Sequence, residues 1–260
     1  MAAFYPRELM AIVLAREIQD GEICSPGGAA SEIPLASVRL AQLTHAPNAV
    51  YLTSASGFVC NLVGKQPPPL TGSTTDWVAV YGGTEALIDW PFVMSTRRDL
   101  FFAGGLQVDV FGNVNLIGVG QYPRLKMRGP GTAGIAQASA LSDRFYIYIQ
   151  EHSPRTLVER VDHISAVGRC ASDPERRRWA LPGGGPRLLV TPKATLGFGD
   201  NGTLELKTRH PGTSCDELME ITPQAFWGPH IRDLPETPAP TEEELHVLRT
   251  QVDPNGVLRR

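Results

Sequence analysis

The most informative stretch of this 260-residue sequence is Gly104-Gly105-Leu106-Gln107-Val108-Asp109-Val110-Phe111-Gly112-Asn113-Val114-Asn115. An apolar run at 100–103 precedes it and predicts a strand that enters a glycine pair. Phe111-Gly112-Asn113 is typical of a tight turn, because glycine and asparagine adopt backbone conformations that most residues avoid. The apolar segments 108–110 and 114–117 on either side of this turn therefore predict a hairpin.

Toward the N-terminus, helical and extended patterns alternate. Residues 6–20 and 34–44 carry apolar side chains at helical spacing, and Pro6 suits a first helical turn. Residues 22–25 and 49–53 are short β-rich runs. Strand, helix and strand in this order predict a parallel βαβ unit, because parallel strands need a crossover connection.

The C-terminal half predicts further strands and a final helix. The expected strands are 145–149, 162–166, 187–191, 194–198 and 203–207, and a short helix is expected at 85–90. The proline-rich segment 234–240 predicts an extended surface linker. Residues 242–252 predict a terminal helix, in which Thr241 is the N-cap and Glu244 completes a capping box. We therefore expect one α/β domain over residues 1–260, with an open, mostly parallel sheet flanked by helices.

Composition narrows the class of protein. The formal net charge is -3 and the basic residues are scattered, which argues against nucleic-acid and membrane partners. Arg176, Arg177 and Arg178 form a basic cluster that predicts an exposed loop, with a phosphate contact as the alternative. The four cysteines lack metal-ligand spacing, so we expect reduced thiols, no metal site and a cytoplasmic location.

The loop Gly129-Pro130-Gly131-Thr132-Ala133-Gly134 is a candidate binding element. Three glycines in six residues let the backbone approach a ligand and direct N–H groups at an anion or oxyanion. The loop is neither a Walker A motif nor a dinucleotide fingerprint, because G-K-[ST] and a surrounding βαβ unit are absent. A flexible surface loop is the alternative interpretation.

The stretch 104–115 resembles the G-G-x-Q-[VI]-D-x-[YF]-G-N-[VQ]-N segment of family I CoA-transferase β subunits, such as that of glutaconate CoA-transferase. A glycine loop follows it, as in that family. Further similarity lies at Thr44-His45-Ala46-Pro47, Leu181 to Pro186, His210-Pro211-Gly212, and 248–254, so the resemblance covers nearly the whole chain. It implies an open CoA-transferase-like α/β fold and a partner α subunit in a heterodimer or heterotetramer. It also implies an acyl-CoA substrate and no tightly bound cofactor, with coenzyme A entering as part of the substrate.

The resemblance also locates a departure from the family. Family members carry a nucleophilic glutamate at the end of the strand that follows an A-P pair, which here is Ala49–Thr53. No Asp or Glu occurs between Asn48 and Lys65, and Ser54 stands where the glutamate is expected. A serine ester does not readily regenerate a CoA thioester, and the nearest histidine in sequence that could act as its base, His45, lies before the strand, so ordinary transfer is in doubt.

Relatives without this glutamate suggest the chemistry that we expect. Steroid ring-opening CoA hydrolases resemble this chain at Ser25-Pro26 and at its acidic C-terminal helix, and another group decarboxylates a glutaconyl-type CoA. Both reactions pass through an anion that backbone N–H groups can stabilise. Genuine CoA transfer and a non-catalytic structural subunit are the alternatives. The expected substrate-binding residues are Ser25, Gly105, Gln107, Gly129, Gly131, Thr132 and Gly134, with Ser54 at the catalytic position. Structural roles for Gln107, Asn113 and Asn115 in holding the turn are the alternative to a substrate contact.

Overall fold

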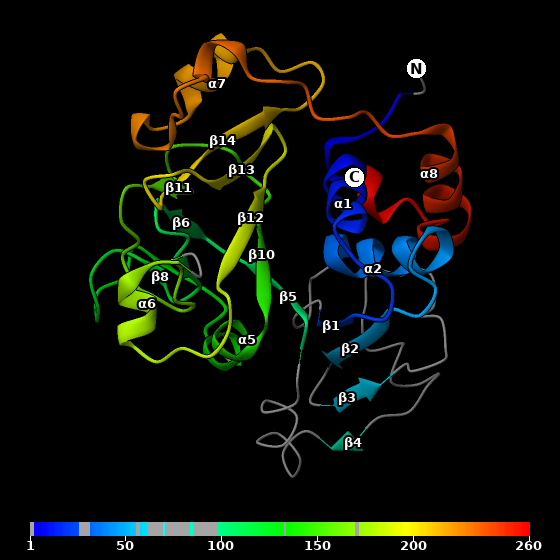
Figure 1. Cartoon of the computed structure of the whole chain (residues 1–260), viewed down its shortest axis with the longest axis horizontal. Coiled ribbons are helices and arrows are strands. Elements are labelled where there is room, and N and C mark those ends of the chain that lie inside the picture. The colour runs from blue at the N-terminus through cyan, green and yellow to red at the C-terminus, as the bar shows by residue number, and fades with distance from the viewer. Residues whose placement is uncertain are drawn as a thin grey trace. The chain divides into compact units, whose positions relative to one another are not determined.

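The computed structural model describes residues 3–25, 32–55, 58–61, 70, 84–85, 98–132, 134–169 and 172–260, and gives only the backbone of 53–55, 58–61 and 84–85. The chain forms two compact units, which we describe separately. The first consists of Met1–Phe102 and Pro240–Arg260, and the second of Ala103–Ala239. The segment 234–240, expected to be an extended linker, crosses this boundary and contains no helix (Figure 1).

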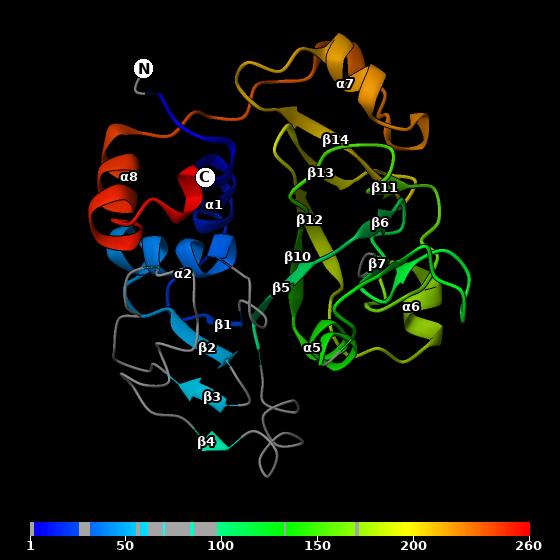
Figure 2. The ribbon, with the colours of Figure 1, turned by 180° about the vertical axis from the view of Figure 1, so that it is seen from behind.

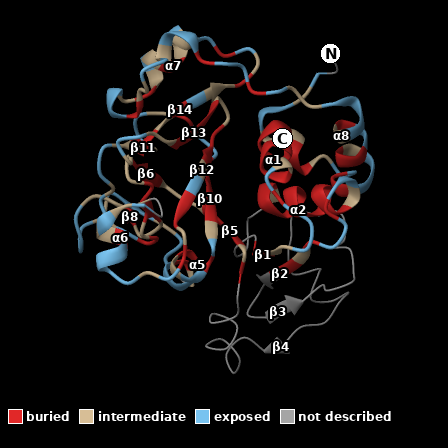
Figure 3. Ribbon diagram, viewed as in Figure 1, coloured by how far each residue is buried: buried red, intermediate tan, exposed pale blue. Residues whose placement is uncertain are grey.

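Two nearly enclosed helices form the core of the first unit. Helices α1 (Pro6–Arg16) and α2 (Glu32–Thr44) pack against each other, and both are largely buried (Figure 3). The apolar side chains Leu9, Ile12 and Val38 are each less than 2% exposed. Burial of such side chains is the main favourable contribution to the stability of the unit.

The C-terminal segment completes this helical layer. Helix α8 (Glu242–Val247) continues as a π-helical turn, η3 (Leu248–Val252), and a 3-10 turn, η4 (Val257–Arg259), follows. Thr241 and Glu244 form the expected capping box. Glu244 also accepts two hydrogen bonds of 2.7 Å from Arg16 of α1, and Arg249 pairs with the buried Glu8 at 2.8 Å.

The sheet of the first unit has a parallel part and an antiparallel edge. Strands β5 (Leu100–Gly104), β1 (Ile23–Ser25) and β2 (Val50–Ala55) are parallel neighbours, which confirms the predicted βαβ unit. Strands β3 (Phe58–Asn61) and β4 (Thr84–Glu85) add to β2 in antiparallel fashion. Glu85 therefore ends a strand, where we had expected a helix to begin, and residues 86–90 lie outside the described part.

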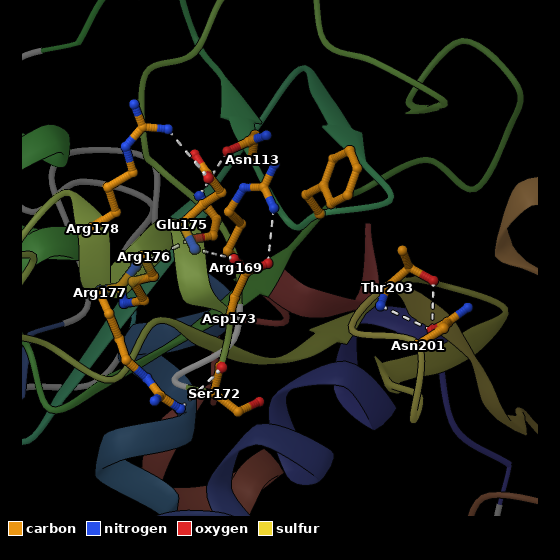
Figure 4. Close-up of polar contacts among 12 residues, drawn as sticks. Asn113, Arg169, Ser172, Asp173, Glu175, Arg176, Arg177, Arg178, Asn201 and Thr203 are labelled. Atoms are coloured by element: carbon orange, nitrogen blue, oxygen red, sulfur yellow. Dashed lines mark hydrogen bonds and ion pairs between the residues drawn. The ribbon is translucent and has the colours of Figure 1, made fainter.

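The second unit contains a mixed sheet of four further strands, which includes four of the five predicted ones. Strands β10 (Arg144–Tyr148) and β12 (Pro186–Val190) are parallel, and β13 (Ala194–Phe198) and β14 (Leu204–Arg209) follow as antiparallel neighbours. Asn201 forms the turn between β13 and β14 by accepting hydrogen bonds from the N–H and hydroxyl of Thr203 (Figure 4). Helix α7 (Cys215–Ile221) and the 3-10 turns η1 (Gln224–Phe226) and η2 (Ile231–Asp233) follow β14.

A smaller sheet carries the hairpin predicted from 104–115. Strands β6 (Gln107–Asp109) and β7 (Val114–Asn115) are antiparallel, and β11 (Leu157–Val158) pairs with β6 in parallel (Figure 2). The strand predicted at 162–166 is wrong, because this segment is irregular and only Ala166 forms an isolated bridge. Its side chains Asp162 and Ser165 accept hydrogen bonds from the backbone N–H groups of Gly120 and Leu116. These bonds compete with the backbone pairing that a strand would need.

The exposed loop predicted at Arg176–Arg178 is also wrong. These residues end a short helix, α6 (Pro174–Arg178), whose N-cap Asp173 accepts a hydrogen bond from the N–H of Glu175. Arg176 is 2% exposed and donates to the carbonyls of Gly183 and Gly168. Asp173 also pairs at 2.8 Å with Arg169, as Figure 4 shows. Arg176 is therefore buried in the interior of the second unit and is not a free surface cation.

Candidate functional site

The buried carboxylate of Asp109 organises the turn between β6 and β7. Its Oδ1 accepts from the N–H groups of Phe111 and Asn113, both at 3.0 Å, and its Oδ2 accepts from the amide of Asn113 at 3.0 Å. Asn113 in turn accepts from the N–H of Gly168 at 2.8 Å. Burial raises the pKa of Asp109, although these hydrogen bonds favour the ionised form. The arrangement is that of a structural turn.

A second network joins the same hairpin to the segment around Asp162. The amide oxygen of Gln107 accepts from Asn115 at 2.7 Å and from the N–H of Asp162 at 3.2 Å. Its amide nitrogen donates to Asp162 at 3.3 Å. Asn115 is fully buried and bonds the backbone of Ile117 and Gly118. The structural roles expected for these side chains are confirmed, and a substrate contact of Gln107 stays a prediction.

Close packing requires two of the predicted glycines. A Cβ on Gly105 would lie 2.6 Å from Cγ1 of Val114, and one on Gly129 would lie 2.2 Å from the carbonyl oxygen of Leu116. Both distances are far below van der Waals contact. The structure thus brings Gly105, Gln107 and Gly129 together around the β6–β7 hairpin.

The glycine loop follows β9 (Met127–Arg128), which pairs with β8 (Gly118–Val119) in a separate antiparallel hairpin. The loop therefore follows a strand of this small hairpin and not a strand of the parallel sheet. The N–H of Gly129 donates to Ile117 at 2.8 Å, and the N–H of Gly131 donates to Leu116 at 3.0 Å. These two N–H groups are therefore already used within the chain.

Other groups of the loop are open to a ligand. Within the described part of the chain, the N–H groups of Thr132 and Gly134 meet no acceptor. Thr132 is exposed, and Gly134 precedes the short helix α5 (Ile135–Leu141) with φ +75°. Gly131 has φ +99° and open space where a Cβ would lie. The loop can thus present backbone donors to an anion, through residues other than its first two glycines.

The β8–β9 hairpin that leads into this loop is an exposed arm, residues 118–128. Tyr122 at its tip is 78% exposed and Met127 is 47% exposed. The N–H of Gly120 donates to Asp162 at 2.8 Å, and the carbonyl of Gly120 accepts from His163 at 2.9 Å. The arm therefore has an exposed tip and an anchored base. Sequence reasoning identified no structure here, because no β-rich run marks these two-residue strands.

The two predicted serines lie in the first unit. Ser25 ends β1 and is 9% exposed. Ser54 belongs to β2 and pairs with Val59 of β3, so the strand continues one residue beyond it. Since β1 and β2 are parallel neighbours, both serines lie toward the same edge of that sheet.

Among the described residues, two buried histidines of the second unit carry large pKa shifts. Burial lowers the pKa of His152 to about 4, and burial also lowers the pKa of His210 to about 4. Every ring nitrogen contacts an oxygen within 2.9 Å, among them those of Thr191, Thr222 and Thr237. His210 packs within the unit. His152 was missed, because its partners Thr191 and Thr222 are 39 and 70 residues away in sequence.

The described residues contain no group of three or more histidine, cysteine or carboxylate side chains placed to hold a metal ion. Over the same residues, no helix combines the length and apolar character that a bilayer crossing requires.

Comparisons with known proteins agree over nearly the whole chain. Residues 7–172 match the family model described as Coenzyme A transferase. The B subunit of the 3-oxoadipate CoA-transferase of Pseudomonas knackmussii is 30% identical over 96% of this chain and 94% of its own length. The cholesterol ring-cleaving hydrolase IpdB subunit of Rhodococcus jostii is 26% identical over 88% of this chain and 85% of its own. The crystal structure of the decarboxylase AibA/AibB matches with a TM-score of 0.78 and 25% identity, covering 99% of this chain and 98% of that one.

Proposed function

Since the chain belongs to the coenzyme A transferase family, we propose that it is the β-like subunit of a heteromer that acts on an acyl-CoA thioester without transferring CoA. The partner is an α subunit of the same family. The reaction is hydrolysis of a carbon–carbon bond or decarboxylation. Relatives with names of both kinds, a ring-cleaving hydrolase and a decarboxylase, support this direction.

One observation carries the proposal. The hairpin of β2 and β3 provides no carboxylate, because Asp and Glu are absent from 49–65 and the position expected for the family glutamate holds Ser54. Transfer through a covalent acyl carrier requires a carboxylate there, since the CoA thiolate must be captured and released again. Carbon–carbon hydrolysis and decarboxylation have no such requirement. A fold that binds acyl-CoA can therefore support either reaction without this carboxylate.

Both reactions need an electron sink. The electrons of the broken carbon–carbon bond move toward the thioester carbonyl, whose oxygen becomes an enolate-like anion. Preorganised N–H donors stabilise such an oxyanion, and loss of one donor costs about 3 kcal/mol in the transition state. We assign this role to the N–H groups of Thr132 and Gly134, which meet no acceptor among the described residues.

The decisive experiment is mass spectrometry of the co-purified complex incubated with dicarboxylyl- and β-keto-acyl-CoAs, with and without acetate. A product that keeps its CoA while it gains water or loses CO₂, independently of acetate, is the expected result. Acetyl-CoA formed only with acetate would instead establish genuine transfer, with a carboxylate from elsewhere.

A pair of glycine variants tests whether this chain only completes the partner's site. Gly131 and Gly202 both have positive φ, and a Cβ added to either would meet no described atom within 4 Å, so alanine strains both backbones alike. We expect Gly131→Ala to lower the turnover number at least tenfold and Gly202→Ala to leave it unchanged. Equal activity of the two variants would favour a structural subunit.

A further inference from the structure

The arm at residues 118–128 stands out by its charge. No Asp or Glu occurs from residue 110 to 142, whereas Arg124, Lys126 and Arg128 lie within five positions of one another. All three cations are exposed. None of them has a carboxylate within 4.0 Å in the described part of the chain. Arg16 and Arg249, by contrast, are paired with glutamates at 2.7 and 2.8 Å.

The strand pairing places Lys126 and Arg128 on one side of the arm. Met127 pairs with Val119 and Arg128 with Gly118, while the N–H of Lys126 donates to the carbonyl of Val119. Successive side chains of a strand point to opposite faces, so Lys126 and Arg128 share a face about 7 Å apart and Met127 occupies the other. Two of the three positive charges therefore share one face.

This cationic face is also held in place. Asp162 and His163 bond the two backbone groups of Gly120 at the start of the connection between the strands. The glycine loop begins directly after Arg128. Clustered cations on a backbone that is fixed in place are the features that bind phosphate groups.

We propose that Arg124, Lys126 and Arg128 bind the phosphates of the 3′-phospho-ADP end of the acyl-CoA. Three neighbouring cations exceed what a single acyl carboxylate neutralises, whereas this end of coenzyme A carries a pyrophosphate and a 3′-phosphate. The inference rests on the proposed function, because it assigns a part of that same substrate to a surface of this chain.

The test measures binding by the assembled heteromer with three probes: coenzyme A, dephospho-CoA and pantetheine. Lys126→Gln and Arg128→Gln each weaken coenzyme A binding about fivefold at low salt, and the double variant about 25-fold. Pantetheine binding, measured by the same titration, stays unchanged. The matched control is Arg155→Gln, because Arg155 is a cation of the same unit whose side chain is 82% exposed and whose partner Glu151 is on the surface.

The outcomes separate the two proposals. Coenzyme A affinities equal to wild type in the double variant would overturn the phosphate assignment and leave the proposed function intact. Dissociation of the variant heteromer in light scattering would overturn it as well, and would identify the arm as a contact for an acidic surface of the partner. A wild-type heteromer that binds none of the probes and converts no acyl-CoA would refute both proposals.

Discussion

Mild acid is expected to destabilise the second unit through His152 and His210. The carbonyl of Thr191 accepts from Nε2 of His210, so Nδ1 of that ring accepts from the hydroxyl of Thr237. The two ring nitrogens of His152 contact the hydroxyls of Thr191 and Thr222, so in the neutral ring one nitrogen donates to a hydroxyl and the other accepts from one. Each ring is neutral, with one donor and one acceptor nitrogen. A second proton would turn the acceptor nitrogen into a donor and break the match.

The size of the effect follows from the pKa values. Both pKa values are lowered from 6.5 to about 4, chiefly by burial and, for His152, also by the neighbouring His210 and Lys193. Because the folded state binds protons less readily than the unfolded state, stability is full above pH 6.5 and is lost as the pH falls toward 4. Each histidine contributes a slope of about 1.4 kcal/mol per pH unit in this window. At pH 5 the pair accounts for a loss of about 4 kcal/mol, a large share of a typical domain stability.

Urea unfolding between pH 5 and 7, followed by tryptophan fluorescence, measures this slope. His152→Gln is expected to reduce it by about half, whatever the variant's absolute stability, because one titrating ring is gone. His246→Gln serves as the control, since His246 is exposed on α8. The difference between wild type and variant also removes the contribution of Asp109, whose raised pKa acts in the opposite direction. An identical slope for wild type and His152→Gln would refute the assignment.

Three further variants test packing and buried charge by urea unfolding. Gly105→Ala places a methyl group 2.6 Å from Val114 and is expected to cost about 1–3 kcal/mol; a neutral variant would show that the hairpin adjusts freely. Asp109→Asn replaces an acceptor of several N–H groups and is expected to cost about 2 kcal/mol, and an unchanged midpoint would contradict the turn's dependence on that carboxylate. Arg249→Met leaves Glu8, which is 1% exposed, without its cation, and is expected to cost about 3 kcal/mol; a loss that is equally large in a Glu8→Gln background would argue that charge is not the cause.

Features that depend on neighbouring residues could be predicted from the sequence. The capping box of Thr241 and Glu244 joins groups three residues apart, and it was predicted. The βαβ order could also be derived, because strand and helix periods differ and a crossover forces parallel pairing. Most of the expected strands were also found, because a β-rich run is a signal carried by neighbouring residues.

Features that depend on distant residues could not be predicted. Ser165 and Asp162 accept hydrogen bonds from the N–H groups of Leu116 and Gly120, which are 49 and 42 residues away in sequence. The segment 162–166 is therefore irregular, although its sequence pattern is that of a strand. Arg176 lies in a run of three arginines, and nothing local indicates that its guanidinium is buried against Gly168 and Gly183. The glycines of the candidate loop were evident from the sequence. Which N–H groups of the loop remain free to bind a ligand depends on the carbonyl groups of Leu116 and Ile117, and this could not be predicted.

The division of the chain into units has a consequence for its synthesis. The second unit is continuous, Ala103–Ala239, whereas the first combines Met1–Phe102 with Pro240–Arg260. Arg16 pairs with Glu244 and Glu8 with Arg249, so these partners of α1 are synthesised only after the whole second unit. The second unit can therefore fold during translation, while the first exposes the apolar surface of α1 and α2 until residues 240–260 emerge. Chaperones that bind nascent chains therefore have a longer opportunity at α1 and α2 than at the second unit, although α1 and α2 are made before it.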